Sequence, residues 1–419
     1  MTELLDRFAL TKARRLMAAT PVLVIEGARQ VGKSTFAAML VADRPHRLMT
    51  LDDADMRALL QEDPVGLLEQ SPDETLVIDE AQRAGEGLLA IKAAVDRDRR
   101  PGRFVLTGSA DLFDLPHNPE SLAGRSMTLR LRGLSQGEIA GQPEDFVAWL
   151  VNPDTNPASF HTQWKRSDYV RAIVAGGYPE ARQMSGELRQ EWFDAYVNAL
   201  LRQDARNIRR RIAPERLHSV LRLIAAAPAG ELVKGRLAEQ ARIAASSITD
   251  YLDLLSTLFL TTRLPPWTAN LARRETGRSK LSVSDSGLAA RLTGLTENGL
   301  TPVETGQALG PLLEAFVAEE LLKQRDWTAQ PFTVSHLRQP GGAEIDVVLE
   351  LDDGRVILLE VKTAHSYRPT QATHLRRIAE QLGDRFAGGA VLGFGDQALR
   401  IGSKLWYLPV AALWQTTVS

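Results

Sequence analysis

The chain has 419 residues, of which 44% are hydrophobic and 24% charged, and its formal net charge is −2. The length excludes a single compact core, the composition excludes a wholly disordered chain, and the absence of cysteine excludes disulfides and thiolate chemistry. The balanced charge leaves nucleic-acid contacts to local patches. Because no apolar run of about 18 residues occurs and the N-terminus mixes both charge signs, we expect a cytoplasmic protein without membrane contact.

Short apolar runs alternate with amphipathic stretches over residues 1–145, the first predicted domain. This alternation predicts an α/β fold in which helices cover both faces of a parallel sheet. The predicted strands are residues 22–26, 47–52, 75–80, 103–109 and 126–132, and helical patterns cover residues 33–42 and 86–98.

The strongest motif follows the first predicted strand. Gly27-Ala28-Arg29-Gln30-Val31-Gly32-Lys33-Ser34 matches G-x-x-x-x-G-K-[ST] and opens a helical pattern, as a P-loop does. The two glycines let backbone N–H groups converge on phosphate oxygens, and the helix N-terminus adds its positive dipole end. Lys33 would bind the β- and γ-phosphates, Ser34 would bind Mg²⁺, and Thr35 could reach the α-phosphate. The motif predicts a site for ATP and Mg²⁺.

Two further apolar strands end in polar residues that suit this site. The run 75–80 ends in Asp79-Glu80, typical of a Walker B strand, in which Asp79 holds the Mg²⁺ shell and Glu80 polarises the attacking water. The run 103–109 offers Thr107 or Ser109 as a polar sensor of the γ-phosphate, and the alternative is a simple turn or helix cap.

Two arginines are candidates for stabilising charge in the transition state. Arg125 could act as an arginine finger delivered from a neighbouring subunit of a homo-oligomer. A surface salt bridge is the alternative for Arg125, and Arg29, inside the loop, is similarly ambiguous.

The middle of the chain reads as helical, with a linker region at 146–229 and a winged-helix-like domain at 230–300. A basic stripe at helical spacing could bind phosphates, and a solvated helix face is the alternative; its members are Arg202, Arg206, Arg209 and Arg210. The second helix of the winged-helix pattern exposes Asp250 and Asp253 and no Lys or Arg, which favours a scaffolding or protein-contact role over DNA reading.

The last predicted domain, residues 301–419, carries a second set of polar residues. A three-residue turn at 352–354 would pair Asp346 with Glu360, so that both project from the same sheet face as Lys362. Two carboxylates and a lysine on adjacent strands can hold a divalent metal and activate water against a phosphodiester. Alternating charge on an exposed strand is the alternative.

A helix before this hairpin would add Glu314 to the metal ligands, with Glu319 and Glu320 as weaker substitutes. The pattern is similar to that of the PD-(D/E)xK nucleases, and it predicts a restriction-endonuclease-like α/β domain.

Taken together, the chain resembles a broad prokaryotic family of AAA-like P-loop ATPases with a C-terminal domain of unknown function. The resemblance implies an ATP and Mg²⁺ site at residues 27–35 and 79–80. It also implies a nuclease-like domain whose site residues are Glu314, Asp346, Glu360 and Lys362. One departure is Ser282, where the family usually has a larger side chain. The segments that carry the resemblance are GARQVGKST, LVIDEAQ, LTGSADLF, SLAGR, GGYPEA, SITDYLDLL, KLSVSDSGLAA, residues 310–317, EIDVVLE and LLEVKTA.

Two functions follow. In the first, ATP binding and hydrolysis control a metal-dependent nuclease that acts on DNA or RNA. In the second, the nucleotide switches a catalytically inactive C-terminal domain that binds a partner or nucleic acid. A third hypothesis, a DNA-binding regulator, is disfavoured by the acidic helix face.

Overall fold

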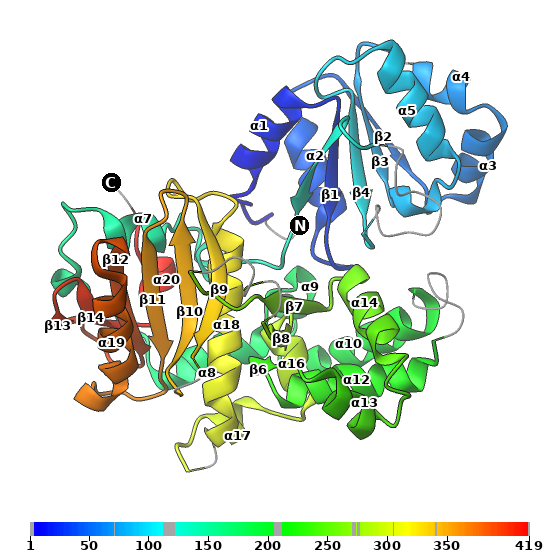
Figure 1. Ribbon diagram of the computed structural model, residues 1–419. Helices are drawn as coiled ribbons and strands as arrows, with labels where there is room; N and C mark the ends of the chain where they lie inside the picture. Colours follow the sequence, from blue (N-terminus) through cyan, green and yellow to red (C-terminus); the bar gives the residue numbers. More distant parts are fainter. Residues whose placement is uncertain are drawn as a thin grey trace.

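The computed structural model describes residues 4–70, 72–111, 122–204, 212–269, 274, 277–304, 306–339 and 342–417. Figure 1 shows an N-terminal α/β domain in blue and cyan, a largely helical green region, and a C-terminal sheet in orange and red. Within the described residues, no helix is both long and apolar enough to cross a membrane.

The N-terminal sheet has five parallel strands in the order β2-β3-β4-β1-β5, as the alternation predicted. Along β1, Leu23 and Ile25 face one hydrophobic cluster, and Val22 and Val24 face another. Both faces are therefore covered, which is why the strands are continuously apolar. The strands are β1 (Val22–Glu26), β2 (His46–Thr50), β3 (Thr75–Asp79), β4 (Phe104–Gly108) and β5 (Ser126–Arg130), and the helices are α1 (Leu10–Ala19), α2 (Lys33–Val41), α3 (Ala54–Glu62), α4 (Pro64–Glu69) and α5 (Gly87–Arg97).

The chain leaves the N-terminal sheet after β5 and packs its next helices on the C-terminal domain. These are α6 (Gln136–Ala140) and α7 (Phe146–Val151). The Trp327 indole N–H donates to the Glu144 carbonyl at 2.8 Å, and the Asp145 N–H donates to the Thr416 carbonyl at 2.9 Å. The first and last parts of the fold are thus joined directly.

The middle region combines a helical bundle with a small antiparallel sheet in the order β6-β8-β7. The order α12, β6, α13, α14, β7, β8 is compatible with the winged-helix prediction, and the predicted apolar stripe of α14 is buried. The elements are α8 (Arg166–Ala175), α9 (Pro179–Gln183), α10 (Gly186–Ala199), η3 (Leu200–Asp204), α12 (Pro214–Ala226), β6 (Gly230–Glu231), α13 (Lys234–Ala241), α14 (Ile248–Thr257), β7 (Thr261–Leu264), β8 (Lys280–Val283), α16 (Ser286–Leu292) and α17 (Glu297–Leu300).

The predicted nucleic-acid surfaces of this region are only partly described. Arg202 is exposed, whereas Arg206, Arg209 and Arg210 lie outside the described residues. The far end of α14 contacts the N-terminal domain, since the Asp111 N–H donates to the Thr257 carbonyl at 3.1 Å. The scaffolding or protein-contact role predicted for the exposed acidic face of α14 stays a prediction.

The C-terminal domain has a mixed six-stranded sheet in the order β13-β14-β12-β11-β10-β9. The predicted hairpin register is confirmed: Val347 pairs with Leu359, and the Leu351 N–H donates to the Arg355 carbonyl across the turn, in which Gly354 has φ +80°. The elements are α18 (Leu309–Gln324), β9 (Phe332–Arg338), β10 (Glu344–Leu351), β11 (Val356–Val361), α19 (Thr373–Leu382), β12 (Phe386–Gly393), β13 (Leu399–Gly402), β14 (Leu405–Pro409) and α20 (Ala412–Gln415), and 3-10 turns cover Ala81–Arg83, Pro157–Ser159, Gly306–Ala308, Pro369–Ala372 and Gly383–Arg385.

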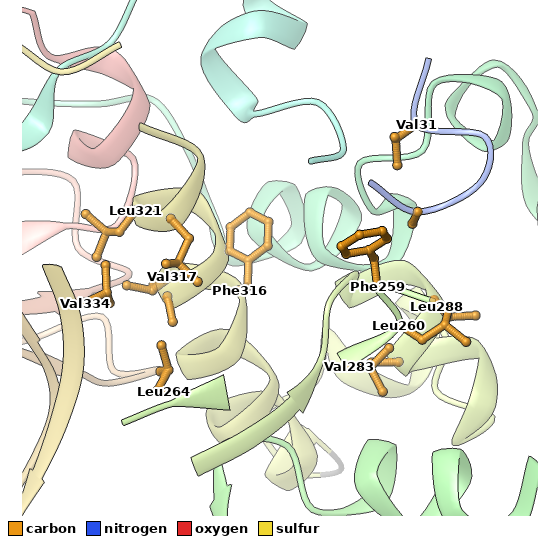
Figure 2. Packing of buried hydrophobic residues seen from close by; sticks show 14 of the residues in the cluster. Val31, Phe259, Leu260, Leu264, Val283, Leu288, Phe316, Val317, Leu321 and Val334 are labelled. Atoms are coloured by element: carbon orange, nitrogen blue, oxygen red, sulfur yellow. The ribbon is translucent and has the colours of Figure 1, made fainter. Parts of the chain in front are cut away.

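One hydrophobic cluster runs through all three parts. Figure 2 shows Phe316 and Leu321 of α18 on the side of the C-terminal sheet, Phe259 of the middle region, and Val31 of the first domain in one view of this cluster. The buried helix α18 therefore links the sheets.

Helix α18 also holds the segment that follows β5 through buried charges. The Lys323 ammonium lies 2.5 Å from a Glu320 carboxylate oxygen and donates to the Leu134 carbonyl at 3.0 Å. The Gln136 N–H donates to Glu320 at 2.8 Å, and Arg132 pairs with Glu319 at 3.0 Å. Glu320 is fully buried, so removal of its carboxylate would leave both donors uncompensated.

We predict that Glu320→Ala lowers the free energy of unfolding by about 3–5 kcal/mol, because a buried ammonium loses its counter-charge. Glu380→Ala, at an exposed position of α19, is the matched control and should change it by less than about 0.5 kcal/mol. Urea unfolding followed by circular dichroism measures both. Equal effects of the two substitutions would contradict the importance of this ion pair.

Candidate functional site

The loop between β1 and α2 is closed around the Lys33 side chain. The Lys33 ammonium donates to the carbonyls of Gly27 and Ala28, both at 3.0 Å, and the side chain is buried. Gly32 has φ +93°, a conformation that side chains disfavour. A Cβ at Gly27 would lie 2.1 Å from the Leu131 carbonyl oxygen, so only glycine fits there. Both glycines of the motif are thus required by the backbone.

The polar ends of α2 and β3 meet beside this loop. The Ser34 hydroxyl donates to both carboxylate oxygens of Asp79, at 2.8 and 2.9 Å. Hydroxyl and carboxylate oxygens are ligands that Mg²⁺ prefers, and nucleotide phosphates usually complete its shell. The donor set therefore fits the predicted Mg²⁺ position. No group of three or more His, Cys, Asp or Glu side chains suited to a metal occurs in the described ranges, so the phosphates would be needed there.

Strand β4 lies between β1 and β3 and positions the acidic pair. The buried Thr107 hydroxyl contacts Asp79 and accepts from the Glu80 N–H at 3.2 Å. The Ser109 hydroxyl donates to the Glu80 carboxylate at 2.9 Å, and the Gln82 amide donates to both Ser109 and Glu80. Glu80 itself has φ +55°, an uncommon backbone state that often marks functional residues. Gln82 was not singled out from the sequence, although it lies in LVIDEAQ.

A cavity of about 740 Å³ opens over the loop and is large enough for a nucleotide. Besides the predicted residues, it is lined by the N-terminal segment and by α9. Arg182 of α9 lines it and donates to the Gly176 carbonyl at 2.8 Å. The sequence did not single out Arg182, because the loop and α9 are about 150 residues apart and meet only in the fold. The lining residues that the sequence did not predict are Leu4, Leu5, Arg7, Phe36, Met39, Asp52, Leu134, Pro179, Glu180, Arg182 and Gln183.

Two buried side chains hold the outer backbone of the loop. Arg7 donates to the Val31 carbonyl at 3.0 Å and to the Arg132 carbonyl at 2.7 Å, and it pairs with Glu138 at 3.1 Å. The Tyr196 hydroxyl of α10 donates to the Arg29 carbonyl at 3.2 Å. The loop is thereby connected to the segment after β5 and to the middle region.

Arg125 lies away from the loop of its own chain. It makes a two-point ion pair with Asp96 of α5, at 2.7 and 2.9 Å. Its carbonyl accepts from the Val22 N–H at the start of β1, whereas the loop follows the end of β1, roughly 17 Å away for a five-residue strand. The structure therefore favours the salt-bridge alternative, and Arg125 cannot reach a nucleotide in the same chain.

The C-terminal carboxylates are brought together as the hairpin register predicted. The Lys362 ammonium lies 2.6 Å from Glu360 and 3.8 Å from Asp346. Burial raises the pKa of Glu360 to about 7 and that of Glu314 to about 8, and Asp346 adds to both shifts. Burial and mutual repulsion thus favour the protonated forms of these carboxyl groups, and a nearby cation is needed to keep them charged.

A residue that the sequence did not indicate lies inside this cluster. The Lys280 ammonium of β8 lies 2.5 Å from Glu314, 3.0 Å from Glu344 and 4.0 Å from Asp346. Burial alone would lower the pKa of Lys280, but Glu314 and the other carboxylates raise it above the usual value, so the side chain stays charged. The predicted ligands are assembled around a lysine, and the predicted substitutes Glu319 and Glu320 face the segment after β5 instead.

Comparison with protein families agrees with the nucleotide site. Residues 19–140 match the model of an AAA domain. The N-terminal domain is an AAA-like P-loop ATPase domain. Residues 166–299 and 309–413 match two domains of unknown function, DUF8612 and DUF4143, which leaves the role of the rest of the chain open.

Similar proteins include two mycobacterial relatives and one solved structure. The uncharacterized proteins Mb2031c of Mycobacterium bovis and Rv2008c of Mycobacterium tuberculosis are each 28% identical over 360 residues, which is 85% of this chain and 73% of theirs. The Walker-type ATPase PABY2304 of Pyrococcus abyssi is 16% identical, with a TM-score of 0.43 over 69% of this chain and 96% of its own. Similarity at that level gives no basis for assigning a function.

We predict that Gly27→Ala weakens ATP binding at least about tenfold, because the added Cβ pushes the loop away from Leu131 and displaces its N–H groups. Gly235→Ala, in open space on α13, is the matched control and should leave binding unchanged while stabilising the fold by about 0.5–1 kcal/mol. Titration with a fluorescent ATP analogue gives the affinities. Unchanged affinity in Gly27→Ala would contradict the steric requirement.

Proposed function

We propose that this chain is a Mg²⁺-dependent ATPase whose nucleotide state controls its C-terminal domain. The observation that supports it most is the meeting of Lys33, Ser34, Asp79 and Glu80 beside one cavity, with Thr107 and Ser109 positioning the acidic pair. These residues come from the carboxyl ends of two adjacent strands, β3 and β4, and from the N-terminus of α2.

Each residue has a distinct chemical part in this proposal. Lys33 exchanges the carbonyls of Gly27 and Ala28 for the β- and γ-phosphates. Bound Mg²⁺ would neutralise phosphate charge between Ser34 and Asp79. Glu80 accepts a proton from the attacking water, and the hydroxyl of Ser109 orients its carboxylate.

The contacts of the loop suggest how the nucleotide state reaches the rest of the chain. Arg7 links the Val31 carbonyl to the segment after β5, and α18 holds that segment through Glu319, Glu320 and Lys323. Movement of the loop on phosphate binding would change the position of α18. Arg182 adds a cation to the cavity from α9 and would respond to the γ-phosphate.

The C-terminal domain has two candidate roles. One is cleavage of DNA or RNA, and the other is binding of a partner or nucleic acid without cleavage. Incubation with plasmid, Mn²⁺ and ATP separates them. Cleavage that is lost in Lys362→Ala assigns the first role, and intact ATPase activity without cleavage of any substrate assigns the second. A trans role for Arg125 in a homo-oligomer would require its pair with Asp96 to open.

We predict that Lys33→Ala raises the Kd for ATP about tenfold or more, since it removes charge-assisted contacts worth about 1.5–3 kcal/mol. Lys92→Ala on α5, outside the cavity lining, is the matched control and should bind as the wild type does. Isothermal titration calorimetry with MgATP measures both. Equal Kd values for Lys33→Ala and the wild type would remove the main support for the function.

We predict that Glu80→Gln binds ATP with nearly wild-type affinity but hydrolyses it about 10²–10⁴-fold more slowly, because the amide cannot take the proton of the attacking water. Steady-state phosphate release gives the rate, and the nucleotide that co-purifies shows whether ATP is retained. Wild-type turnover in Glu80→Gln would assign the base to another residue.

A further inference from the structure

Lys280 occupies an unusual place for a lysine. Its side chain is 3% exposed, and the ammonium lies among the carboxylates of Glu314, Glu344 and Asp346 at 2.5, 3.0 and 4.0 Å. The three carboxylates belong to the C-terminal domain, on α18 and β10, whereas Lys280 belongs to β8 of the middle sheet. A buried cation of one region thus neutralises acidic residues of another.

The position of Lys280 is fixed by the strands on both sides of it. In the middle sheet Lys280 pairs with Leu264 of β7 and with Glu231 of β6. The segment before β8 is tied to β9, because the His336 ring contacts the Arg278 carbonyl at 3.0 Å and the Trp267 N–H donates to the His336 carbonyl. These contacts hold the backbone of Lys280 against β9, so that movement of the middle sheet away from β9 and β10 would carry the lysine out of the cluster.

The ammonium fills the space that a divalent ion would need. A divalent ion binds carboxylate oxygens at about 2.0–2.6 Å, and Glu314 already contacts the ammonium at 2.5 Å. The two cations therefore compete for Glu314 and Asp346.

One carboxylate oxygen of the cluster has no partner among the described residues even with both lysines in place. Within the described residues, one oxygen of Glu360 is buried without a hydrogen-bond partner, although the other oxygen is held by Lys362 at 2.6 Å. Glu360 is 9% exposed and directly follows Leu359, which pairs with Val347, the residue after Asp346. A buried carboxylate oxygen without a partner is costly, so a cation admitted to this place would be bound.

We propose that Lys280 is the resident cation of the C-terminal carboxylate cluster and closes it to divalent metal ions while β8 is docked. Glu314, Asp346 and Glu360 become a site for Mg²⁺ or Mn²⁺ only when the lysine is withdrawn. Metal-dependent chemistry at this cluster and docking of the middle sheet are then mutually exclusive.

This inference rests on the proposed control of the C-terminal domain and says how that control could act. It does not depend on nucleotide binding. Its test is made without ATP on the 419-residue chain carrying Ser34→Ala and Asp79→Asn, so that both proposed metal ligands of the nucleotide site are removed. A negative result in this metal-binding test would not bear on the proposed ATPase activity. Absence of ATPase activity would likewise leave the metal-binding test valid.

The test is Mn²⁺ binding measured by electron paramagnetic resonance. We predict that Lys280→Met, which keeps most of the side-chain volume without the charge, binds one Mn²⁺ per chain at least tenfold more tightly than the parent. Lys280→Arg keeps a cation and should bind no better than the parent. Asp346→Asn, added to Lys280→Met, should abolish the gain.

Two results would overturn the proposal. The first is tight Mn²⁺ binding by the parent that is lost on Asp346→Asn, since the lysine would then not exclude the metal. The second is a folded Lys280→Met chain, with thermal unfolding close to that of the parent, that binds Mn²⁺ no better than the parent.

A measurement on the wild type decides the question if Lys280→Met does not fold. Acetylation of lysines, followed by mass spectrometry, should label Lys280 at least tenfold more slowly than the exposed Lys404. Labelling of both residues at similar rates would show that the ammonium does not stay among the carboxylates, and would equally overturn the proposal.

Discussion

The account depends on one backbone constraint, the tight turn of the loop that ends β1 and begins α2. Gly27 passes so close to the Leu131 carbonyl that no side chain fits, and Gly32 has a left-handed backbone. This path turns two carbonyls toward the Lys33 ammonium and holds the lysine at the mouth of the cavity. Arg7 donates to the Val31 carbonyl and Tyr196 donates to the Arg29 carbonyl of the same loop. The conformation of the loop is therefore coupled to the rest of the chain.

The order of the parallel strands supplies the other half of the site. Because β4 separates β1 from β3, its hydroxyl residues stand beside the acidic pair at the carboxyl edge of the sheet. The buried Thr107 hydroxyl contacts Asp79 and accepts a hydrogen bond from the Glu80 N–H. The Ser109 hydroxyl donates to the Glu80 carboxylate. The strand that carries these residues acts as a spacer that fixes the distance between phosphate loop and acidic pair.

Local sequence patterns predicted the helices and strands well. They did not predict contacts between residues that are far apart in the chain. The five N-terminal strands, the P-loop and the register of the β10–β11 hairpin follow from hydrophobic runs and turn residues that lie close together in the sequence. Arg182 and Lys280 were missed, since each acts on residues far away in the chain. Of the two, Lys280 carried a faint signal, a charge at the first position of a short strand whose four residues prove buried. Strand direction places Arg125 at the end of the sheet away from the loop of its own chain, so its predicted action on a neighbouring subunit stays a prediction.

A crystal structure with Mg²⁺ and a non-hydrolysable ATP analogue tests the central claim most directly. The account predicts that the triphosphate lies along the N–H groups of the loop, that the Lys33 ammonium has left Gly27 and Ala28 for the phosphates, and that the metal separates Ser34 from Asp79. A loop that stays empty at saturating analogue, with Lys33 still on the two carbonyls, would contradict it.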